Sequence, residues 1–391
     1  MLKTALQIFC IFLKLGLTSF GGPIAHLGYF HHEFVDRRKW LSEKAYLDVV
    51  VLCQFLPGPT SSQVSFAIGL NRAGYLGGIA SWLGFTLPSV LILSLFAWLM
   101  GANQSWANTS VIHGLKIVAV VIITQAVYSM SIKICNTTKT MAIAIAATCV
   151  ALLLPFAWAQ VLIILFAALF GILLLNQNHM TGLDFFSSKI SKRAGALWLI
   201  SFFILLLVFP VLNWLQSSKL LELFNIFYQT GAMVFGGGHV VLPLLEAKLV
   251  QTGLVSQSDF LAGYGLAQAI PSPLFSFAAY LGGIIDTNKP VFTSLVCLIA
   301  MFLSGFLLLM AVLPFWQQVC QRTKVQTALK GVNAAVVGLL LAALYQPVWI
   351  SSILNTKSFV IALMSFWLLQ GYKLAPWCIV VFCALCGWLL L

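Results

Sequence analysis

The sequence predicts an all-α polytopic membrane protein built from two homologous repeats, and three observations support this. First, 61% of the 391 residues are hydrophobic and only 8% are charged, whereas soluble proteins carry about 25% charged residues. Second, the apolar runs are continuous rather than alternating, which favours membrane helices. Third, a pattern that breaks helices occurs twice, near residues 54 and 268. The lipid bilayer is therefore the predicted environment of the chain.

Apolar segments follow one another along the first half of the chain. Two of them are interrupted, one by Gly-Gly-Pro at residues 21–23 and the other by Pro-Gly-Pro at 57–59. A charged loop at residues 31–44 separates these two segments. The expected apolar segments are residues 4–30, 45–70, 76–100, 111–132, 140–154, 158–176 and 195–215.

The second half repeats the first at a nearly constant offset. The Gln-x-x-Pro-x-Pro pattern of residues 54–59 returns 214 residues later. Phe-Gly-Gly at residues 20–22 returns at an offset of 215, and Leu-Lys-x-Val at 115–118 returns at 214. A constant offset indicates internal duplication rather than chance. The predicted parts are an N-terminal repeat at residues 1–176, a cytoplasmic loop with a linker transmembrane helix at 177–218, and a C-terminal repeat at 219–391.

Loop charge predicts how the repeats are oriented, because Lys and Arg gather in cytoplasmic loops. If each half opens with two re-entrant hairpins and the second half is inverted, fifteen of these residues lie inside and four outside. If the first segment instead spans the membrane and the halves run parallel, the division is thirteen to six. The inverted arrangement fits better, and the broken segments are either re-entrant or full spans. The net charge of +12 is explained by Lys and Arg in the loops on the cytoplasmic side. Nucleic acid is therefore not expected as a partner.

The repeated breaks predict a binding site. Two prolines that flank a glycine cannot continue a helix, and broken backbone at membrane depth is tolerated where it lines a cavity. The half-helix after a break directs free N–H groups and a positive dipole end at an anion. Close helix packing is the alternative, but breaks present in both halves favour a site. The residues concerned are Gly21, Gly22, Pro23, Pro57, Gly58, Pro59, Gly236, Gly237, Gly238, Pro271, Ser272 and Pro273.

Polar side chains beside the breaks are candidate ligands of such an anion. Gln54 and Gln268 occupy matched positions, and an amide donates two hydrogen bonds without bringing charge. Hydrogen bonding between helices explains them equally well. Thr60 and Ser61 add hydroxyl donors after the first break, whereas the second copy has Leu and Phe at these places. The first half is therefore expected to form the more polar side of the site.

Five ionisable side chains lie near these segments. Lys116 and Lys330 occupy matched positions and either attract an anion or extend to the membrane interface. His26 and His239 follow the two glycine breaks and are candidates for proton coupling, although a structural histidine explains each as well. Glu33 is a further coupling candidate, but it lies in the charged loop and is expected to pair with the arginine four residues later.

The chain lacks the motifs of an enzyme. It contains no P-loop, no His-Glu-x-x-His and no nucleophile elbow. The Cys-x-x-Cys at residues 383–386 lies in an apolar segment, where small residues that pack between helices explain it. Only nine residues are acidic, so no relay of carboxylates through the membrane is expected. Catalytic activity, a cofactor and a metal site are not expected.

Three motifs in order resemble those of the chromate transporter family. They are Phe-Gly-Gly-Pro-x-Ala-His at residues 20–26, Glu-Phe-Val with Arg-Arg and Trp-Leu-Ser at 33–42, and Gln-x-x-Pro-Gly-Pro at 54–59. The second half, with Phe-Gly-Gly-Gly-His at 235–239, is similar to that of the long-chain, two-repeat members, and the resemblance covers essentially the whole chain. Asparagine often follows Pro-Gly-Pro in this family, and Thr60 stands there instead.

The resemblance implies a carrier of the bacterial inner membrane that expels chromate, confers chromate resistance and mistakes chromate for sulfate or exchanges the two. These tetrahedral dianions suit N–H groups, amides, hydroxyls and lysines. The expected mechanism is alternating access, in which one repeat rocks against the other. The alternatives are an uptake permease for sulfate or another oxyanion, and a membrane-embedded protein that handles lipid. A homodimer and a single chain with a complete cavity are both compatible with the sequence.

Overall fold

The computed structural model describes residues 2–19, 22–102, 110–154, 157–175, 190–216, 218–235, 240–271, 273–320 and 322–390. Within these ranges the regular structure is helical throughout, which confirms the predicted all-α class. In chain order the elements are α1 (Leu2–Thr18), α2 (Gly22–His31), η1 (His32–Arg37), α3 (Glu43–Phe55), α4 (Thr60–Ala102), α5 (Ser110–Ile134), α6 (Thr138–Leu153), α7 (Ala157–Leu174), α8 (Lys192–Leu215), α9 (Lys219–Met233), α10 (Val241–Leu249), α11 (Gln257–Ala269), η4 (Leu274–Ser276), α12 (Phe277–Ile285), α13 (Pro290–Val312), η5 (Leu313–Phe315), α14 (Trp316–Cys320), α15 (Thr323–Ala343), η6 (Leu344–Trp349), α16 (Ile350–Ser352), α17 (Thr356–Gln370) and α18 (Pro376–Leu390).

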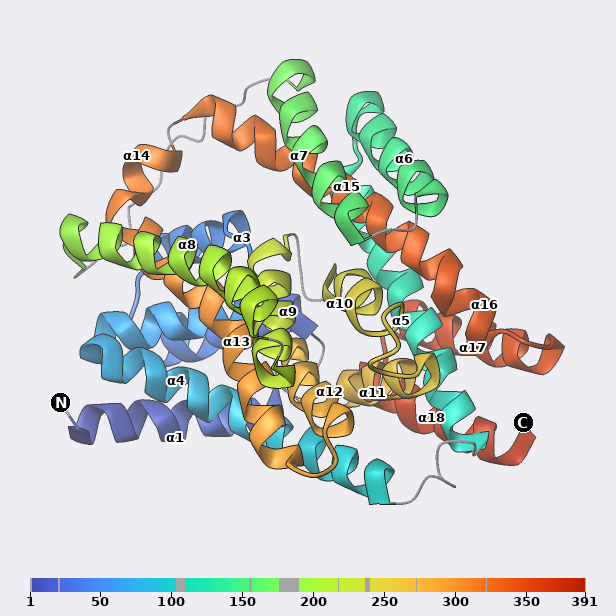
Figure 1. The fold of residues 1–391 in the computed structure, drawn as a ribbon. Coiled ribbons are helices and arrows are strands. Elements are labelled where there is room, and N and C mark those ends of the chain that lie inside the picture. Colours follow the sequence, from blue (N-terminus) through green and yellow to red (C-terminus); the bar gives the residue numbers. More distant parts are fainter. Residues whose placement is uncertain are drawn as a thin grey trace. The chain divides into compact units, whose positions relative to one another are not determined.

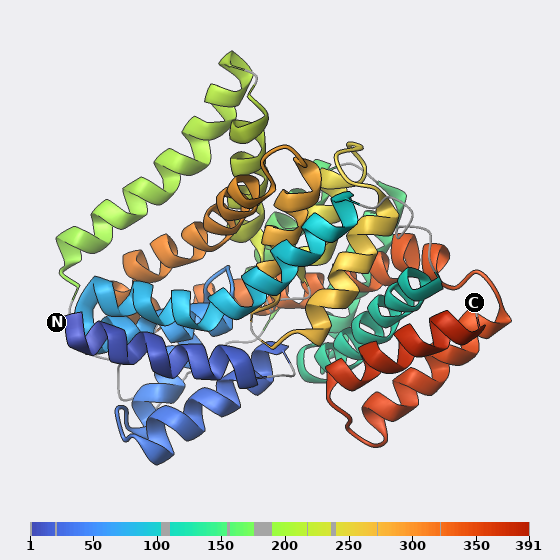
Figure 2. The same ribbon diagram turned by 90° about the horizontal axis from the view of Figure 1, so that it is seen from below.

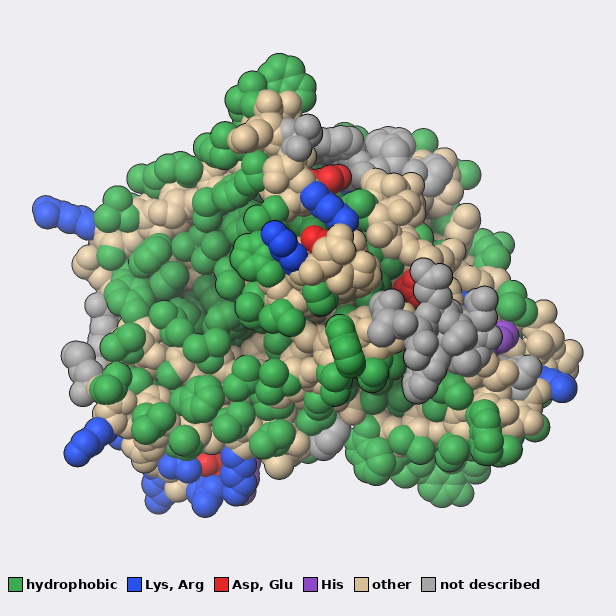
Figure 3. Space-filling view, turned by 60° about the horizontal axis from the view of Figure 1, so that its bottom comes forward, with side chains coloured by type: hydrophobic (Ala, Val, Ile, Leu, Met, Phe, Trp, Pro, Cys, Tyr) green, Lys and Arg blue, Asp and Glu red, His purple; other side chains and the backbone are tan. Residues whose placement is uncertain are grey.

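Several of these helices are suited to a membrane. Five helical stretches are long and apolar enough to cross it, starting at Thr60, Ser110, Lys192, Pro290 and Thr323. Figure 3 shows a face covered mainly by hydrophobic side chains, with Lys and Arg gathered in a few places. The chain is therefore a multi-pass membrane protein.

The chain forms two compact units, and each combines segments from both halves of the sequence. Unit 1 consists of Met1–Leu95, Asn178–Gly238 and Pro271–Arg322. Unit 2 consists of Phe96–Gln177, His239–Ile270 and Thr323–Leu391. The predicted repeats are thus interleaved in space, while their boundaries and the inversion of the second repeat stay predictions.

The two halves share the same local construction at the Pro-x-Pro breaks. The side chains of Ser42 and Ser256 accept hydrogen bonds from the backbone at the starts of α3 and α11, as serine does at a helix N-cap. Both helices then run for 13 residues and end just before the break, because the residue that precedes a proline leaves the α region. The next helical residues, Thr60 and Leu274, again lie 214 positions apart.

After the break the two copies differ. The separate segments predicted at residues 45–70 and 76–100 are joined, because α4 continues through a kink at Ala73 and Gly74. Gly74 has a φ of +65°, a conformation that glycine adopts without strain. In the second half, a turn between α12 and α13 stands at the place of this kink.

In unit 1, α4 and α13 pack against each other through aromatic side chains. The rings of Phe66 and Phe306 stack with their centroids 4.5 Å apart. Trp82 of α4 lies against both Phe302 and Phe306, at 5.6 and 5.7 Å between ring centroids. Helices α8 and α9 also pack on α13. The long helices of the two halves therefore form a common core.

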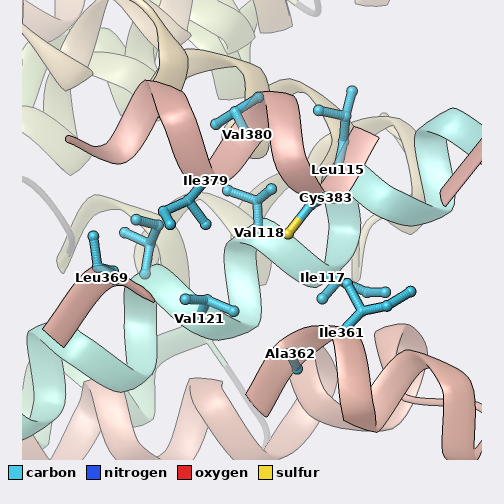
Figure 4. Close-up of a cluster of buried hydrophobic side chains, with 11 residues drawn as sticks. Leu115, Ile117, Val118, Val121, Ile361, Ala362, Leu369, Ile379, Val380 and Cys383 are labelled. Carbon is cyan, nitrogen blue, oxygen red and sulfur yellow. The ribbon is translucent and has the colours of Figure 1, made fainter. Parts of the chain in front are cut away.

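In unit 2, each half packs its last two helices on a long helix of the other half. Helices α6 and α7 pack on α15, whereas α17 and α18 pack on α5, as Figure 1 and Figure 2 show. Buried side chains of α5, α17 and α18 form one cluster that includes Val118, Ile361 and Cys383 (Figure 4). The two halves thus exchange equivalent helix pairs.

The exchanged pairs share the same close contact between glycines. Gly171 of α7 lies against Gly331 of α15, and Gly387 of α18 lies against Gly114 of α5. A Cβ atom at any of these four positions would collide with backbone of the partner helix. Small residues allow membrane helices to approach this closely.

We predict that Gly331→Ala destabilises the protein by about 1–3 kcal/mol, because the new methyl group would collide with the backbone of α7. Thermal unfolding of the purified protein in detergent measures the change. Gly28→Ala is the matched control, since a Cβ on this exposed helical glycine has no neighbour within 4 Å. Equal unfolding temperatures for the two variants would contradict the packing described here.

Candidate substrate-binding site

The first Pro-x-Pro break is a tight turn fixed to its surroundings within unit 1. Leu56 has extended backbone angles (φ −81°, ψ 147°), as a residue before proline must. Gly58 has a φ of +125°, which favours glycine alone. Its N–H donates to the carbonyl of Val234, at the end of α9, over 2.7 Å. The turn is therefore attached to the residue that precedes the second glycine-rich stretch.

Gln63 holds the turn against α13. Its Nε2 donates to the carbonyl oxygens of Pro57 and Gly305, each at 3.0 Å. A Cβ on Gly58 would lie 2.9 Å from this amide nitrogen and 3.0 Å from Cα of Gly305. The glycines at 58 and 305 leave room for the side chain of Gln63 between them. The break therefore lies directly on α13, a helix of the second half.

Donors without a partner inside their own helix lie at the start of α4. The first N–H groups of a helix have no partner within it, and here they belong to Thr60, Ser61 and Ser62. Ser61 and Ser62 are buried, and no partner of the Ser62 hydroxyl is found among the described residues. A helix N-terminus with free N–H groups and a hydroxyl is suited to binding an anion.

The second break is packed in the reciprocal way. Pro273 leads into η4, where the Ser276 hydroxyl is hydrogen-bonded to that of Ser89 in α4 over 2.7 Å. Ser276 is the counterpart of Ser62 at the offset of 214. The first break therefore contacts the long helix of the second half, and the second break contacts the long helix of the first.

The other predicted ligands are distributed between the units. Gln54, in the last turn of α3, is exposed and belongs to unit 1. Gln268 belongs to unit 2, and its Nε2 is buried with no hydrogen-bond partner among the described residues. Gly22 and Pro23 begin α2 in unit 1, and Pro271 belongs to unit 1 as well. The remaining predicted residues, Gly21, Gly236, Gly237, Gly238, His239 and Ser272, lie outside the described ranges.

The two matched lysines have different surroundings within unit 2. Lys116 is half-buried and within electrostatic reach of Asp259 in α11. Lys330 is exposed. The close glycine contacts align Gly114 with Gly331, which is an offset of 217 instead of 214. The sequence match of the lysines therefore does not correspond to an equivalent position in the packing.

His26 is held as a buried neutral side chain. Its Nε2 is 3.2 Å from the carbonyl oxygen of Ser19, and its ring meets Phe85 edge-on. Burial lowers the pKa of His26 to about 4, although the hydrogen bond to Ser19 acts in the opposite direction. His26 is thus uncharged at neutral pH.

Glu33 is ion-paired, as expected, and it binds two arginines. Arg37 donates to both carboxylate oxygens at 3.0 and 3.3 Å, and Nε of Arg38 donates at 2.6 Å. The guanidinium groups of Arg38 and Arg72 lie over the ring of Trp40, at 5.7 and 5.0 Å from its centroid. The ion pairs and the cation–π contacts therefore hold the charged motif at residues 33–42 in a fixed conformation after α2.

The comparisons with known proteins agree with this architecture. A family model described as "Chromate transporter" matches residues 6–172 and again residues 221–388. The chain belongs to the chromate transporter family. The two matched regions of this chromate transporter family member fit the two-repeat layout. No solved structure matches the chain.

Curated relatives cover most of this family member. A probable chromate transport protein of Synechococcus elongatus is 29% identical over 97% of the chain and 94% of its own length. A chromate transport protein of Pseudomonas aeruginosa is 27% identical over 85% of the chain and 79% of its own length. An uncharacterized transporter of Methanocaldococcus jannaschii is 27% identical over 87% of the chain and 83% of its own length.

Sequence reasoning missed the groups that fix the first break. Gly305 and Val234 lie far from Gly58 along the chain, and no local signal connects them. The amide of Gln63 follows the break by four residues, but its backbone partners depend on the fold. The serines at 89 and 276 also resemble many others in apolar helices.

We predict that Gln63→Leu destabilises unit 1 by about 1–3 kcal/mol, because the carbonyls of Pro57 and Gly305 lose their donor while the side-chain volume changes little. Thermal unfolding of the purified protein in detergent measures this change. Gln7→Leu, at an exposed position of α1, is the control. An unchanged unfolding temperature for Gln63→Leu would show that the amide does not hold the break.

We predict that Glu33→Gln destabilises the protein by about 1–2 kcal/mol at pH 7, because two charge-assisted hydrogen bonds are weakened. Burial raises the pKa of Glu33, but the hydrogen bonds and charges of Arg38 and Arg37 outweigh it, so the pKa lies below its ordinary value. The carboxylate therefore stabilises the fold at neutral pH, and this stabilisation disappears as pH falls through the lowered pKa.

Unfolding of wild type and Glu33→Gln by denaturant, measured from pH 7 down to about 3, tests whether the stabilisation by the carboxylate is lost as pH falls. The difference in stability should shrink as pH falls. Glu43→Gln at an exposed position is the control and should show little difference at any pH. A constant difference across the range would exclude the ion pair as its cause.

Proposed function

We propose that the protein is a secondary transporter that exports chromate across the bacterial inner membrane, in exchange for sulfate, and thereby confers chromate resistance. Membership of the chromate transporter family supports chromate as the substrate. The observation that carries the proposal is the reciprocal packing of the two breaks on the long helices of the opposite halves. Paired broken helices at a repeat interface are the usual place of a substrate site in carriers.

The substrate chemistry follows from the donors at the breaks. A tetrahedral dianion accepts hydrogen bonds from the free N–H groups of Thr60, Ser61 and Ser62 and from the Ser62 hydroxyl. We propose that Gln54 and Gln268 add amide donors and that Lys116 and Lys330 attract the anion. The glycine and proline residues of the breaks, Gly21, Gly22, Pro23, Pro57, Gly58, Pro59, Gly236, Gly237, Gly238, Pro271, Ser272 and Pro273, bring backbone close to it.

The proposed mechanism is alternating access between inverted repeats. Binding by N–H groups and neutral side chains is moderate, which suits a carrier that must also release its substrate. No catalytic step or cofactor is part of this proposal. Uptake of sulfate or another oxyanion through the same site is the second candidate, because a helix N-terminus binds either tetrahedral anion in the same way.

We predict that cells that produce the protein accumulate less chromate, and that Gln54→Ala and Pro57→Ala abolish this effect. Removing the amide donor of Gln54 from a charged ligand costs about 1.5–3 kcal/mol, which weakens transport by about tenfold or more, and replacing Pro57 removes the ring that keeps the chain out of the helix at the break. Gln7→Ala on α1 is the control, and immunoblots of membranes verify that every variant is inserted. Higher chromate accumulation in producing cells would instead indicate uptake.

Flux of labelled chromate and sulfate in proteoliposomes decides between transport and lipid handling. Exchange of the two anions supports the proposal, whereas no flux under any gradient favours a lipid-handling protein. Normal export by Gln54→Ala and Pro57→Ala would show that the site lies elsewhere in the chain.

A further inference from the structure

Unit 2 contains a polar cavity that the proposed substrate site does not use. It has a volume of about 650 Å³ and lies between α10, the end of α6, the start of α7 and the end of α15. Its polar side chains are one carboxylate, Glu246, and four amides, Gln160, Gln251, Gln257 and Gln346. Glu246 and Gln257 are half-buried, while Gln251 and Gln346 are exposed, so the cavity opens to the surface of the protein.

Helix ends of both polarities line this cavity. The last turns of α6 and α10 bring unpaired carbonyl groups to its wall, and the first turns of α7 and α11 bring unpaired N–H groups. Gln346 departs from helical geometry (φ −132°, ψ 117°) within the π-helical element η6, at another wall of the cavity. Such distortions of helices are frequent at functional sites.

Glu246 is the only charged side chain among the described residues that line the cavity. Its Oε2 accepts a hydrogen bond from Nε2 of Gln251 over 3.4 Å, and Nε2 of Gln160 donates a hydrogen bond to the carbonyl oxygen of Pro243. Helix α7 has no charged residue. The charged side chains on the other elements around the cavity, none of which lines it, are Lys139 on α6, Lys248 on α10, Asp259 on α11, and Lys324 and Lys330 on α15.

A carboxylate in such surroundings favours its neutral form. Burial raises the pKa of Glu246 to about 7, against the hydrogen bond from Gln251, which lowers it. Helix α10 has nine residues and is not one of the spanning helices. Glu246 can therefore change between carboxylic acid and carboxylate near neutral pH, in a cavity that opens to the surface of the protein.

We propose that Glu246 binds the proton that couples oxyanion transport to a proton gradient, an inference that rests on the proposed transport function. The proton adds to a carboxylate oxygen from water on one side of the membrane and leaves to water on the other, and no other bond is made or broken. The cavity residue Gln251 positions the carboxyl group by its amide. The anion binds elsewhere, at the helix breaks.

Proteoliposomes that contain the full chain and sulfate test the proposal in two assays. The first measures exchange of labelled sulfate at equal pH on both sides. The second imposes a gradient of about one pH unit, which drives accumulation by up to about tenfold for each coupled proton. We expect the gradient to stimulate the wild type, and the Glu246→Gln variant to exchange sulfate without any stimulation and without pH dependence.

Glu222→Gln is the control, because Glu222 lies at the start of α9 in unit 1, outside the cavity. It should respond to the gradient as the wild type does. Stimulation of Glu246→Gln by the gradient would overturn the proposal, as would stimulation of the wild type by a sodium gradient alone. Absence of exchange in the wild type would instead refute the proposed transport function.

Infrared difference spectroscopy tests the proton site without transport. The band of a protonated carboxyl group should appear in the wild type as pH falls through the neutral range, and should be missing from Glu246→Gln. Gln251→Leu should move the midpoint to higher pH, because the hydrogen bond that favours the carboxylate is lost. A spectrum of Glu246→Gln identical to that of the wild type would contradict the assignment.

Discussion

Backbone that leaves a helix inside a membrane needs hydrogen-bond partners from the protein, because lipid provides none. At the first break a single side chain meets much of this need. The amide of Gln63 satisfies the carbonyls of Pro57 and Gly305, and Val234 receives the N–H of Gly58. The ends of α3 and α9, the start of α4 and the middle of α13 are fixed together by these few bonds. The unpaired donors of α4 keep their direction as a result.

The halves of the molecule depend on each other at two levels. At the breaks, each Pro-x-Pro turn contacts the long helix of the opposite half. In unit 2, each long helix carries the terminal helix pair of the opposite half, with the same contact between glycines. Because the halves exchange equivalent helix pairs, the glycine-containing faces of α5 and α15 are both covered by helices of the opposite half. The compact units therefore cut across the repeats that the sequence predicts.

Local signals explain what the sequence predicted well. Prolines act on their immediate neighbours, so the breaks that end α3 and α11 follow from the residues themselves. The pairing of Glu33 with Arg37 is local too, at a spacing of four residues.

Contacts between distant segments explain what the sequence did not reveal. The partners of Gln63, the exchange of helix pairs and the different surroundings of Lys116 and Lys330 depend on how helices pack. The cavity at Glu246 was also missed, since its walls come from segments that lie far apart in the sequence. A carboxylate in a nine-residue helix has no sequence signal of its own.

The exchange of helix pairs has a consequence for biosynthesis. The ribosome completes α6 and α7 long before it reaches α15, on which both helices pack. During this interval the glycine face of α7 has no partner from its own half of the chain. An early product that ends after the first repeat would present that face to lipid, to a chaperone or to a membrane protease. Maturation of the first half must therefore wait for translation of the second.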